Sequence, residues 1–190
     1  MTILEIRIVG DPVLRTPATE VTTFGPELAR LVADMTETMD AVDGAGLAAP
    51  QIGVGLRVFT YRVDGHDGHV VNPVLEVGGP EDLSASEGCL SVPGLGYRLP
   101  RHGWARVTGA DVNGEPLVVE GEGMLARCLQ HETDHLDGRL YIDRLRGADK
   151  KDALGKIRTS RYNDVAAKTR SKRAPAVDSS FGGGTFGVGR

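Results

Sequence analysis

Gln130-His131-Glu132-Thr133-Asp134-His135-Leu136 is the stretch from which the organisation of this chain can be worked out. Residues four apart lie on one face of a helix, so His131 and His135 can both reach a single metal ion. Glu132 lies beside that ion, where a carboxylate can take a proton from water and pass it to a leaving group. The stretch therefore predicts a helix built for metal-assisted hydrolysis. The alternative is a surface helix that carries these side chains by chance.

Two histidines leave a tetrahedral catalytic site one protein ligand short. The protease pattern His-Glu-x-x-His-x-x-Gly-x-x-His would end on a third histidine, but Tyr141 stands there, and no glutamate follows the helix. Cys128 lies on the same helical face but about 10 Å along the axis from His135, too far to share one ion. We expect Cys128 to line a pocket wall and Cys89 to be the third ligand. A buried structural thiol is the alternative for Cys89.

Two further segments accompany the histidine motif: Gly44-Ala45-Gly46-Leu47-Ala48-Ala49-Pro50-Gln51 and Glu87-Gly88-Cys89-Leu90-Ser91. In their order and separations, the three motifs resemble the signatures of bacterial peptide deformylases. The likeness extends from Arg7 to about Asp143. It implies an α+β fold in which antiparallel β-sheets surround a central metal-binding helix, with an N-terminal amphipathic helix and a C-terminal helix.

The resemblance also implies a reaction, the removal of the N-formyl group from the terminal formylmethionine of newly made polypeptides, with release of formate. Glu132 would move the proton, and Gln51 with the backbone N–H of Leu90 would hold the oxyanion. The metal ligands would be Cys89, His131 and His135. Substrate contacts are expected from Ala45, Gly46, Met124 and Cys128. Arg127 departs from the apolar residue expected there, so its charge either extends into water or alters the pocket rim.

The metal itself is not decided by the ligands. One thiolate and two imidazoles suggest zinc, but affinity also follows metal availability. Members of the family characteristically use ferrous iron, which zinc, nickel or cobalt can replace. We therefore expect one Fe²⁺ per chain, with these other ions as substitutes.

Length and composition bound the remaining possibilities. The chain has 190 residues, of which 40% are hydrophobic, and this suits one catalytic domain, expected over residues 1–147. The net charge of −4 gives no general attraction to nucleic acid, and two cysteines make no disulfide framework. No signal peptide or membrane-spanning run is evident, so we expect a cytoplasmic protein with no membrane contact, and a monomer.

Hydrophobic spacing and turn residues predict the other elements. A helix is expected over Pro26–Val42, and the motif helix from near Glu122 to a left-handed end at Gly138. Strands are expected over Arg57–Val63, around Val70-Val71 and over Val74–Val77, with a turn at residues 64–68. Asn113-Gly114 predicts a hairpin. His66 and His69, in or beside the first turn, are interpreted as solvated.

Two interpretations stay open at this point. Arg101 either pairs with Glu87 and holds the cysteine-bearing strand, or is solvated. The basic segment 148–173, expected to include a helix, either contacts the ribosome through RNA phosphates or is a solvated extension. The Gly- and Ser-rich residues 174–190 are predicted to be disordered.

Two other functions compete with deformylation. A zinc endopeptidase would keep the motif helix but would cleave unformylated peptides internally. A non-catalytic, metal-stabilised ribosome-binding protein would keep the basic segment but show no turnover.

Overall fold

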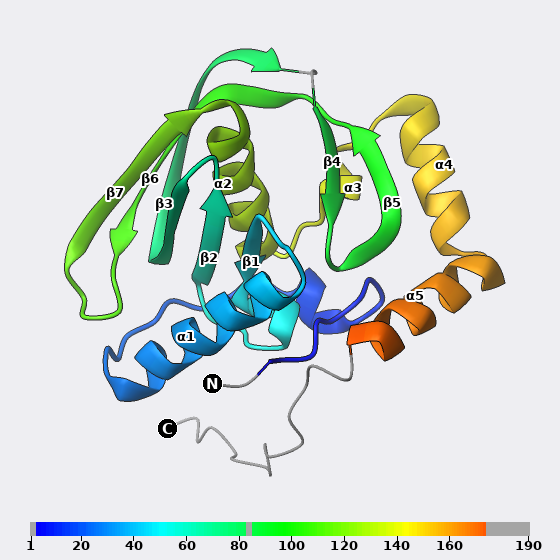
Figure 1. Cartoon of the computed structure of the whole chain (residues 1–190). Coiled ribbons are helices and arrows are strands. Elements are labelled where there is room, and N and C mark those ends of the chain that lie inside the picture. The colour runs from blue at the N-terminus through cyan, green and yellow to red at the C-terminus, as the bar shows by residue number, and fades with distance from the viewer. Residues whose placement is uncertain (1–2, 83–84, 174–190) are drawn as a thin grey trace.

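The computed structural model describes residues 3–82 and 85–173. Its central element is the helix α2 (Gly123–Leu136), which lies between a five-stranded sheet and a two-stranded sheet (Figure 1). The strand order is β1-β2-β3-β6-β7 in the larger sheet and β4-β5 in the smaller one, and neighbouring strands are antiparallel. The α+β architecture expected from the sequence is confirmed.

The larger sheet consists of β1 (Gly46–Ala48), β2 (Val58–Val63), β3 (His66–Asp82), β6 (Arg101–Ala110) and β7 (Pro116–Glu122). The smaller one consists of β4 (Ser86–Cys89) and β5 (Val92–Arg98). The other helices are α1 (Pro26–Ala41), α3 (Tyr141–Arg144), α4 (Gly147–Ile157) and α5 (Ser160–Arg173), with the 3-10 turns η1 (Pro12–Arg15) and η2 (Ala49–Ile52). Thus the helix predicted from Pro26 and the hairpin predicted at Asn113-Gly114 are both present.

Strand β2 is buried on both faces because α1 and α2 cover opposite sides of the sheet. Successive side chains of a strand point to opposite faces. Val58 packs in a cluster with Met35 and Met39 of α1, whereas Phe59 packs in a cluster with Leu129 of α2. The apolar run in this strand therefore fixes both helices against the sheet and sets the position of the motif helix.

The two short strands expected around Val70-Val71 and over Val74–Val77 are parts of one long strand, β3. Its register shifts between Val71 and Val74, where Pro73 lacks an N–H for the ladder and Asn72 has a φ of 52°. The Asn72 side-chain amide binds both backbone groups of Val21, at 2.8 and 2.9 Å. The side chain at the irregularity thus ties a distant loop to β3, and propensity alone does not predict this.

The expected five-residue turn at residues 64–68 is shorter than predicted, because β3 already begins at His66. His66 is exposed, as predicted. The prediction for His69 is wrong, since this side chain is partly buried and its Nε2 accepts the backbone N–H of Val112 at 3.1 Å.

Helix α2 ends as its sequence predicts. Gly138 has a φ of +71°, in the left-handed region that glycine adopts without strain. The adjoining N–H of Arg139 donates to the carbonyl of Asp134 at 2.8 Å. A Cβ at Gly138 would also lie 2.9 Å from the backbone carbonyl carbon of Arg15, so the site requires glycine for two reasons.

The basic segment 148–173 lies in two helices, α4 and α5. Tyr162 and Ala166 of α5 are buried against Ile8, and the side chain of Val165 packs close to Gly94 of β5. Residues 174–190, where the sequence predicts disorder, lie outside the described residues. In the part of the chain that the structure describes, no helix combines the length and apolar character needed to cross a bilayer.

Substituting Gly138→Ala is expected to lower the free energy of unfolding by about 1–3 kcal/mol, because it adds both backbone strain and a steric clash. Urea unfolding of the metal-stripped protein measures the change. The matched control is Gly155→Ala in the interior of α4, where an added Cβ meets nothing within 4 Å. That variant should gain up to about 1 kcal/mol. Equal urea midpoints for the two variants would contradict the account of the helix end.

Candidate metal centre

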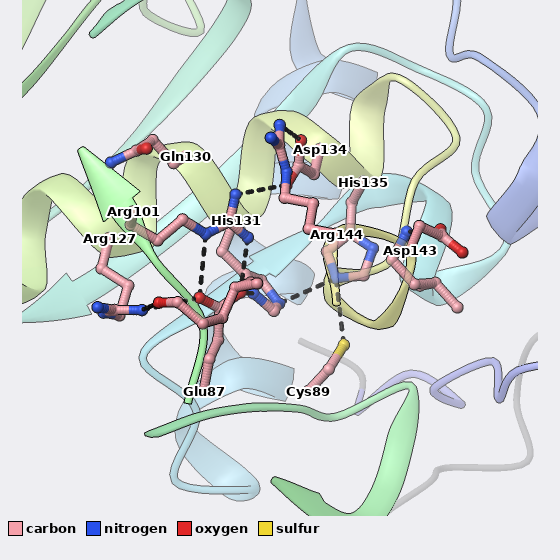
Figure 2. A network of polar contacts seen from close by, with 12 residues as sticks. Glu87, Cys89, Arg101, Arg127, Gln130, His131, Asp134, His135, Asp143 and Arg144 are labelled. Carbon is pink, nitrogen blue, oxygen red and sulfur yellow. Dashed lines mark hydrogen bonds and ion pairs between the residues drawn. The ribbon is translucent and has the colours of Figure 1, made fainter. Parts of the chain in front are cut away.

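Three side chains from two elements converge beside α2. Cys89 at the end of β4 places its Sγ 3.2 Å from Nε2 of His135, and this nitrogen is 3.2 Å from Nε2 of His131 (Figure 2). The three ligand atoms all lie within 4.8 Å of one another. The predicted ligands are therefore brought together as one Cys/His/His cluster.

The cluster fits a divalent ion. Metal–ligand bonds of about 2.0–2.3 Å in a tetrahedral site place neighbouring ligand atoms roughly 3.3–3.7 Å apart, close to the observed spacing. Burial lowers the pKa of His135, which favours the neutral imidazole that a metal requires. The carboxylate oxygen Oε2 of Glu132 is also buried, with no hydrogen-bond partner among the described residues. An unpartnered carboxylate beside these ligands is the arrangement expected where a water or substrate binds.

Glu87 orients one of the ligands. Its Oε1 lies 2.6 Å from Nδ1 of His131, which leaves Nε2 directed at the cluster. Arg101 donates to both oxygens of Glu87, at 3.0 and 2.6 Å, and both residues are buried. Burial alone would raise the pKa of Glu87, but the hydrogen bonds from His131 and Arg101 outweigh it and hold that pKa well below its usual value. The hypothesis that Arg101 pairs with Glu87 is confirmed.

The same arginine joins a larger group of charged side chains, all of them buried except the exposed Arg144 (Figure 2). Arg101 also donates to Asp134 at 2.6 Å, and Arg144 at the end of α3 donates to Asp134 at 2.6 Å. Arg127 donates to Glu87 at 3.2 Å and to the carbonyl of Leu99 at 2.8 Å. We call Glu87, Arg101, Arg127, Asp134 and Arg144 the ionic cluster. It links β4, β6, α2 and α3.

Arg127 therefore differs from the first interpretation of its charge. It is 4% exposed, so the guanidinium does not extend into water. Arg127 lines the cavity beside the metal cluster, which is compatible with the second interpretation, an altered pocket rim. It binds the carboxylate that orients His131. Sequence spacing placed Arg127 on the right helix face, but its partners come from residues about 28 to 45 positions away.

Glu132 lies in a confined position. It is 3% exposed, and burial raises the pKa of its carboxyl to about 7. A Cβ at Gly46 would fall 2.7 Å from the carboxyl carbon of Glu132, so the backbone of β1 packs directly against the acid. A carboxyl with a pKa near neutrality is suited to accept and return a proton.

Gln51 reaches the same place from η2. Its Oε1 accepts the N–H of Ala48 at 2.8 Å, which fixes the amide so that Nε2 points to Ser91 Oγ at 3.2 Å and Cys89 Sγ at 3.7 Å. The N–H of Ser91 lies 3.4 Å from the same sulfur. Ser91, which adjoins the predicted Leu90, is a further residue of the site that was not predicted from the sequence.

A cavity of about 570 Å³ opens beside the cluster. The residues expected to contact substrate all line it: Ala45, Gly46, Met124 and Cys128, together with Gln51 and Leu90. Burial raises the pKa of the Cys128 thiol well above its usual value, and its Sγ donates to the carbonyl of Ala45. Cys128 is therefore a neutral, hydrogen-bonded thiol in the wall of the cavity, as predicted.

Other parts of the site were not found from the sequence. Asp134 lies three residues after His131 inside the histidine motif, so its spacing could have suggested a contact on the same face of the helix. Arg144, Thr169 and Arg173 carry no such signal. The last two come from α5 and line the cavity.

The family model described as polypeptide deformylase matches residues 3–151. A peptide deformylase of Acidothermus cellulolyticus is 50% identical over 175 residues, covering 92% of this chain and 97% of that protein. One from Mycolicibacterium paratuberculosis is 48% identical, covering 85% and 91%. The crystal structure of a peptide deformylase from Legionella pneumophila superposes with a TM-score of 0.79 at 38% identity, covering 87% of this chain and 98% of that one.

Substituting Arg101→Ala is expected to weaken metal binding by about tenfold to hundredfold, because Glu87 would lose the guanidinium that holds it against His131. Removing one partner of a buried ion pair should also lower the free energy of unfolding by about 3–5 kcal/mol. Competition against a chelator measures the affinity, and urea unfolding measures the stability. The control is Arg62→Ala, whose ion pair with Asp40 is at the surface, with a side chain 51% exposed. Unchanged metal affinity in Arg101→Ala would contradict the role assigned to this arginine.

Proposed function

The chain belongs to the polypeptide deformylase family, and we propose from this premise which of its residues carry out each part of the reaction. The protein removes the N-formyl group from newly made polypeptides. Membership of this family favours deformylation over the endopeptidase and over the non-catalytic ribosome-binding protein. The observation that carries the assignment of roles is the buried, unpartnered carboxylate of Glu132 beside a Cys/His/His cluster at the end of a cavity.

Cys89, His131 and His135 would hold the divalent ion. When bound, the ion would supply Lewis acidity, lowering the pKa of water and polarising the formyl carbonyl. We propose that the ion is Fe²⁺ in the cell and that zinc, nickel or cobalt can replace it. Support for iron comes from the likeness to the family, because the ligand set alone also suits zinc.

Glu132 is proposed to move the proton. Its carboxylate accepts a proton from water as the formyl carbon is attacked, and then returns that proton to the amine of the departing peptide. The pKa near 7 leaves this group able to act in both directions at neutral pH. Its lack of any other hydrogen-bond partner among the described residues keeps the oxygen available to the substrate side of the site.

Gln51 and the N–H of Leu90 are proposed to donate to the oxyanion that forms at the formyl carbon. The bond from Ala48 to Gln51 Oε1 supports this role, because it fixes the amide with its NH₂ group toward Cys89. A preorganised donor of this kind contributes about 3–4 kcal/mol to the stabilisation of a transition state.

The substrate is proposed to enter along the short strand β1. Ala45 and Gly46 border the cavity with backbone groups, and Met124 and Cys128 provide apolar surface for the methionine side chain. Met124 is 41% exposed, so it lies at the rim, while Cys128 lies in the wall. We further propose a cytoplasmic monomer with its catalytic domain over residues 1–147.

We also propose that α4 and α5 contact the ribosome, where formylated chains emerge. The support is a group of exposed cations on α5 that includes Lys168, Arg170 and Lys172, on a protein of net charge −4. Such a group favours contact with RNA phosphates.

The first experiment is anaerobic turnover of formyl-Met-Ala-Ser by the iron-loaded protein, followed by formate release. The variant Glu132→Gln keeps the shape of the side chain but cannot accept the proton, so kcat should fall by roughly 10²–10⁴ with the metal content unchanged. Acetyl-Met-Ala-Ser serves as the control substrate and should release no acetate. A metal-replete wild type that releases no formate would overturn the assignment. If Glu132→Gln released formate with the kcat of the wild type, only the role of Glu132 in proton transfer would be overturned.

The ribosome proposal is tested by co-sedimentation with purified ribosomes. The double variant Lys168→Glu, Lys172→Glu should bind several-fold more weakly than wild type, and the wild-type affinity should fall steeply between about 50 and 200 mM salt. The matched control, Arg30→Glu with Arg106→Glu, changes the net charge equally at positions whose side chains are 66% and 40% exposed elsewhere on the surface. Equal losses for both double variants would show a general charge effect and contradict a specific contact through α5.

A further inference from the structure

Helix α5 contributes a charged group to the cavity of the metal centre. Thr169 and Arg173, in the last turns of the helix, line the same cavity as Gln51, Cys89 and Glu132. The metal ligands and the acid Glu132 come from β4 and α2. Arg173 is a cation that reaches the same cavity from the basic C-terminal segment, and the proposed reaction gives it no role.

Arg173 is held close to the reacting atoms. Its Nη1 donates to the backbone carbonyl of Leu90 at 3.1 Å, and Leu90 directly follows the ligand Cys89. The helix that carries it is anchored by Tyr162 and Ala166, which are 6% and 3% exposed. In Figure 1 the far end of α5 lies below the β4–β5 hairpin, as this contact requires.

The charge on Arg173 is not compensated within the described chain. The other charged residues at the cavity include Arg127 and Glu87, which bind one another, and the acids Asp43 and Glu132, neither of which forms an ion pair with Arg173 in the described part of the chain. Arg173 makes its hydrogen bond to a neutral carbonyl and forms no ion pair with any residue in ranges 3–82 and 85–173. It is also partly buried, and this burial lowers its pKa. A guanidinium has five N–H donors in a planar fork, so donors remain for a second acceptor.

A partly desolvated guanidinium without a counter-ion favours the binding of an anion. The established reaction brings a peptide into this cavity. An extended peptide advances about 3.3 Å per residue. Because Arg173 contacts the residue next to Cys89, a peptide with its formyl group at the cluster would bring its second or third residue to the guanidinium.

We propose that Arg173 is a specificity-determining residue that binds a carboxylate side chain on the second or third residue of the formyl peptide. This proposal rests on the proposed function. It makes α5 a part of the substrate site, and it predicts that chains with an early aspartate or glutamate are processed faster than neutral ones.

The test compares four amidated peptides: formyl-Met-Asp-Ala and formyl-Met-Ala-Asp, each beside its asparagine counterpart. Amidation removes the terminal carboxylate, so only the side chain differs. With the wild-type iron enzyme, at least one aspartate peptide should show a kcat/KM about threefold to tenfold above its counterpart, through a lower KM. Arg173→Met should abolish this preference, so that each aspartate peptide falls to the kcat/KM of its asparagine counterpart. Arg173→Glu should reverse it, so that a lysine peptide is favoured over aspartate.

The matched control is Arg170→Met, which removes an exposed cation from the same turn of α5. Arg170 borders a different cavity, formed with residues 5–11. This variant should keep the preference for aspartate. A wild type without any preference, or equal loss in both methionine variants, would overturn the proposal. A large fall of kcat for the asparagine peptides in Arg173→Met would also overturn it, because the residue would then act on the Leu90 loop.

Circular dichroism and thermal unfolding confirm that each variant is folded. This experiment tests the proposed function and the specificity of Arg173 separately. No formate from any peptide would defeat the proposed function, and the specificity proposal with it. Formate from all four peptides at equal rates would defeat the specificity proposal alone.

Discussion

The buried carboxylate of Glu87 is the group on which the metal centre depends. It accepts from His131, Arg101 and Arg127 at once, and these donors come from α2 and β6, while Glu87 itself is on β4. A buried charge is tolerated only when it is paired and hydrogen-bonded. Each partner is therefore held to a narrow range of positions. One consequence is that the strand carrying Cys89 and the helix carrying both histidines are aligned before any ion binds.

The same requirement explains how α2 can be both polar and central. One face of the helix is apolar, and Leu125, Ala126 and Leu129 pack against the larger sheet. Its other face carries Arg127, His131 and Asp134, which would be costly to bury alone. The ionic cluster and the smaller sheet satisfy these groups. Among the described side chains of α2, two buried atoms have no hydrogen-bond partner, Nδ1 of His135 and Oε2 of Glu132, and the second belongs to the group proposed to move a proton.

Much of this arrangement can be predicted from sequence because its signals are local. The i, i+4 histidines, the intervening acid and the glycine that ends α2 all lie within one short segment, and their geometry follows from helical periodicity. Cys89 could be assigned because two histidines need a further ligand. The partners of Arg127 and the hydrogen bond of His69 could not be predicted, because they join residues about 28 to 45 positions apart. The contact of Arg173 with Leu90 joins residues 83 positions apart, and it depends on how α5 packs back onto the rest of the chain.

Strand β1 is the last strand at one side of the larger sheet and has only three residues. Its pairing with β2 uses one edge, and its other edge adjoins the cavity through Gly46. An open strand edge offers backbone donors and acceptors that any polypeptide can match, whatever its side chains. An enzyme that must process many different proteins gains generality from such an edge. The short length of β1 also limits the risk of aggregation at this open edge. Three residues offer too few backbone hydrogen bonds to recruit a strand from another molecule.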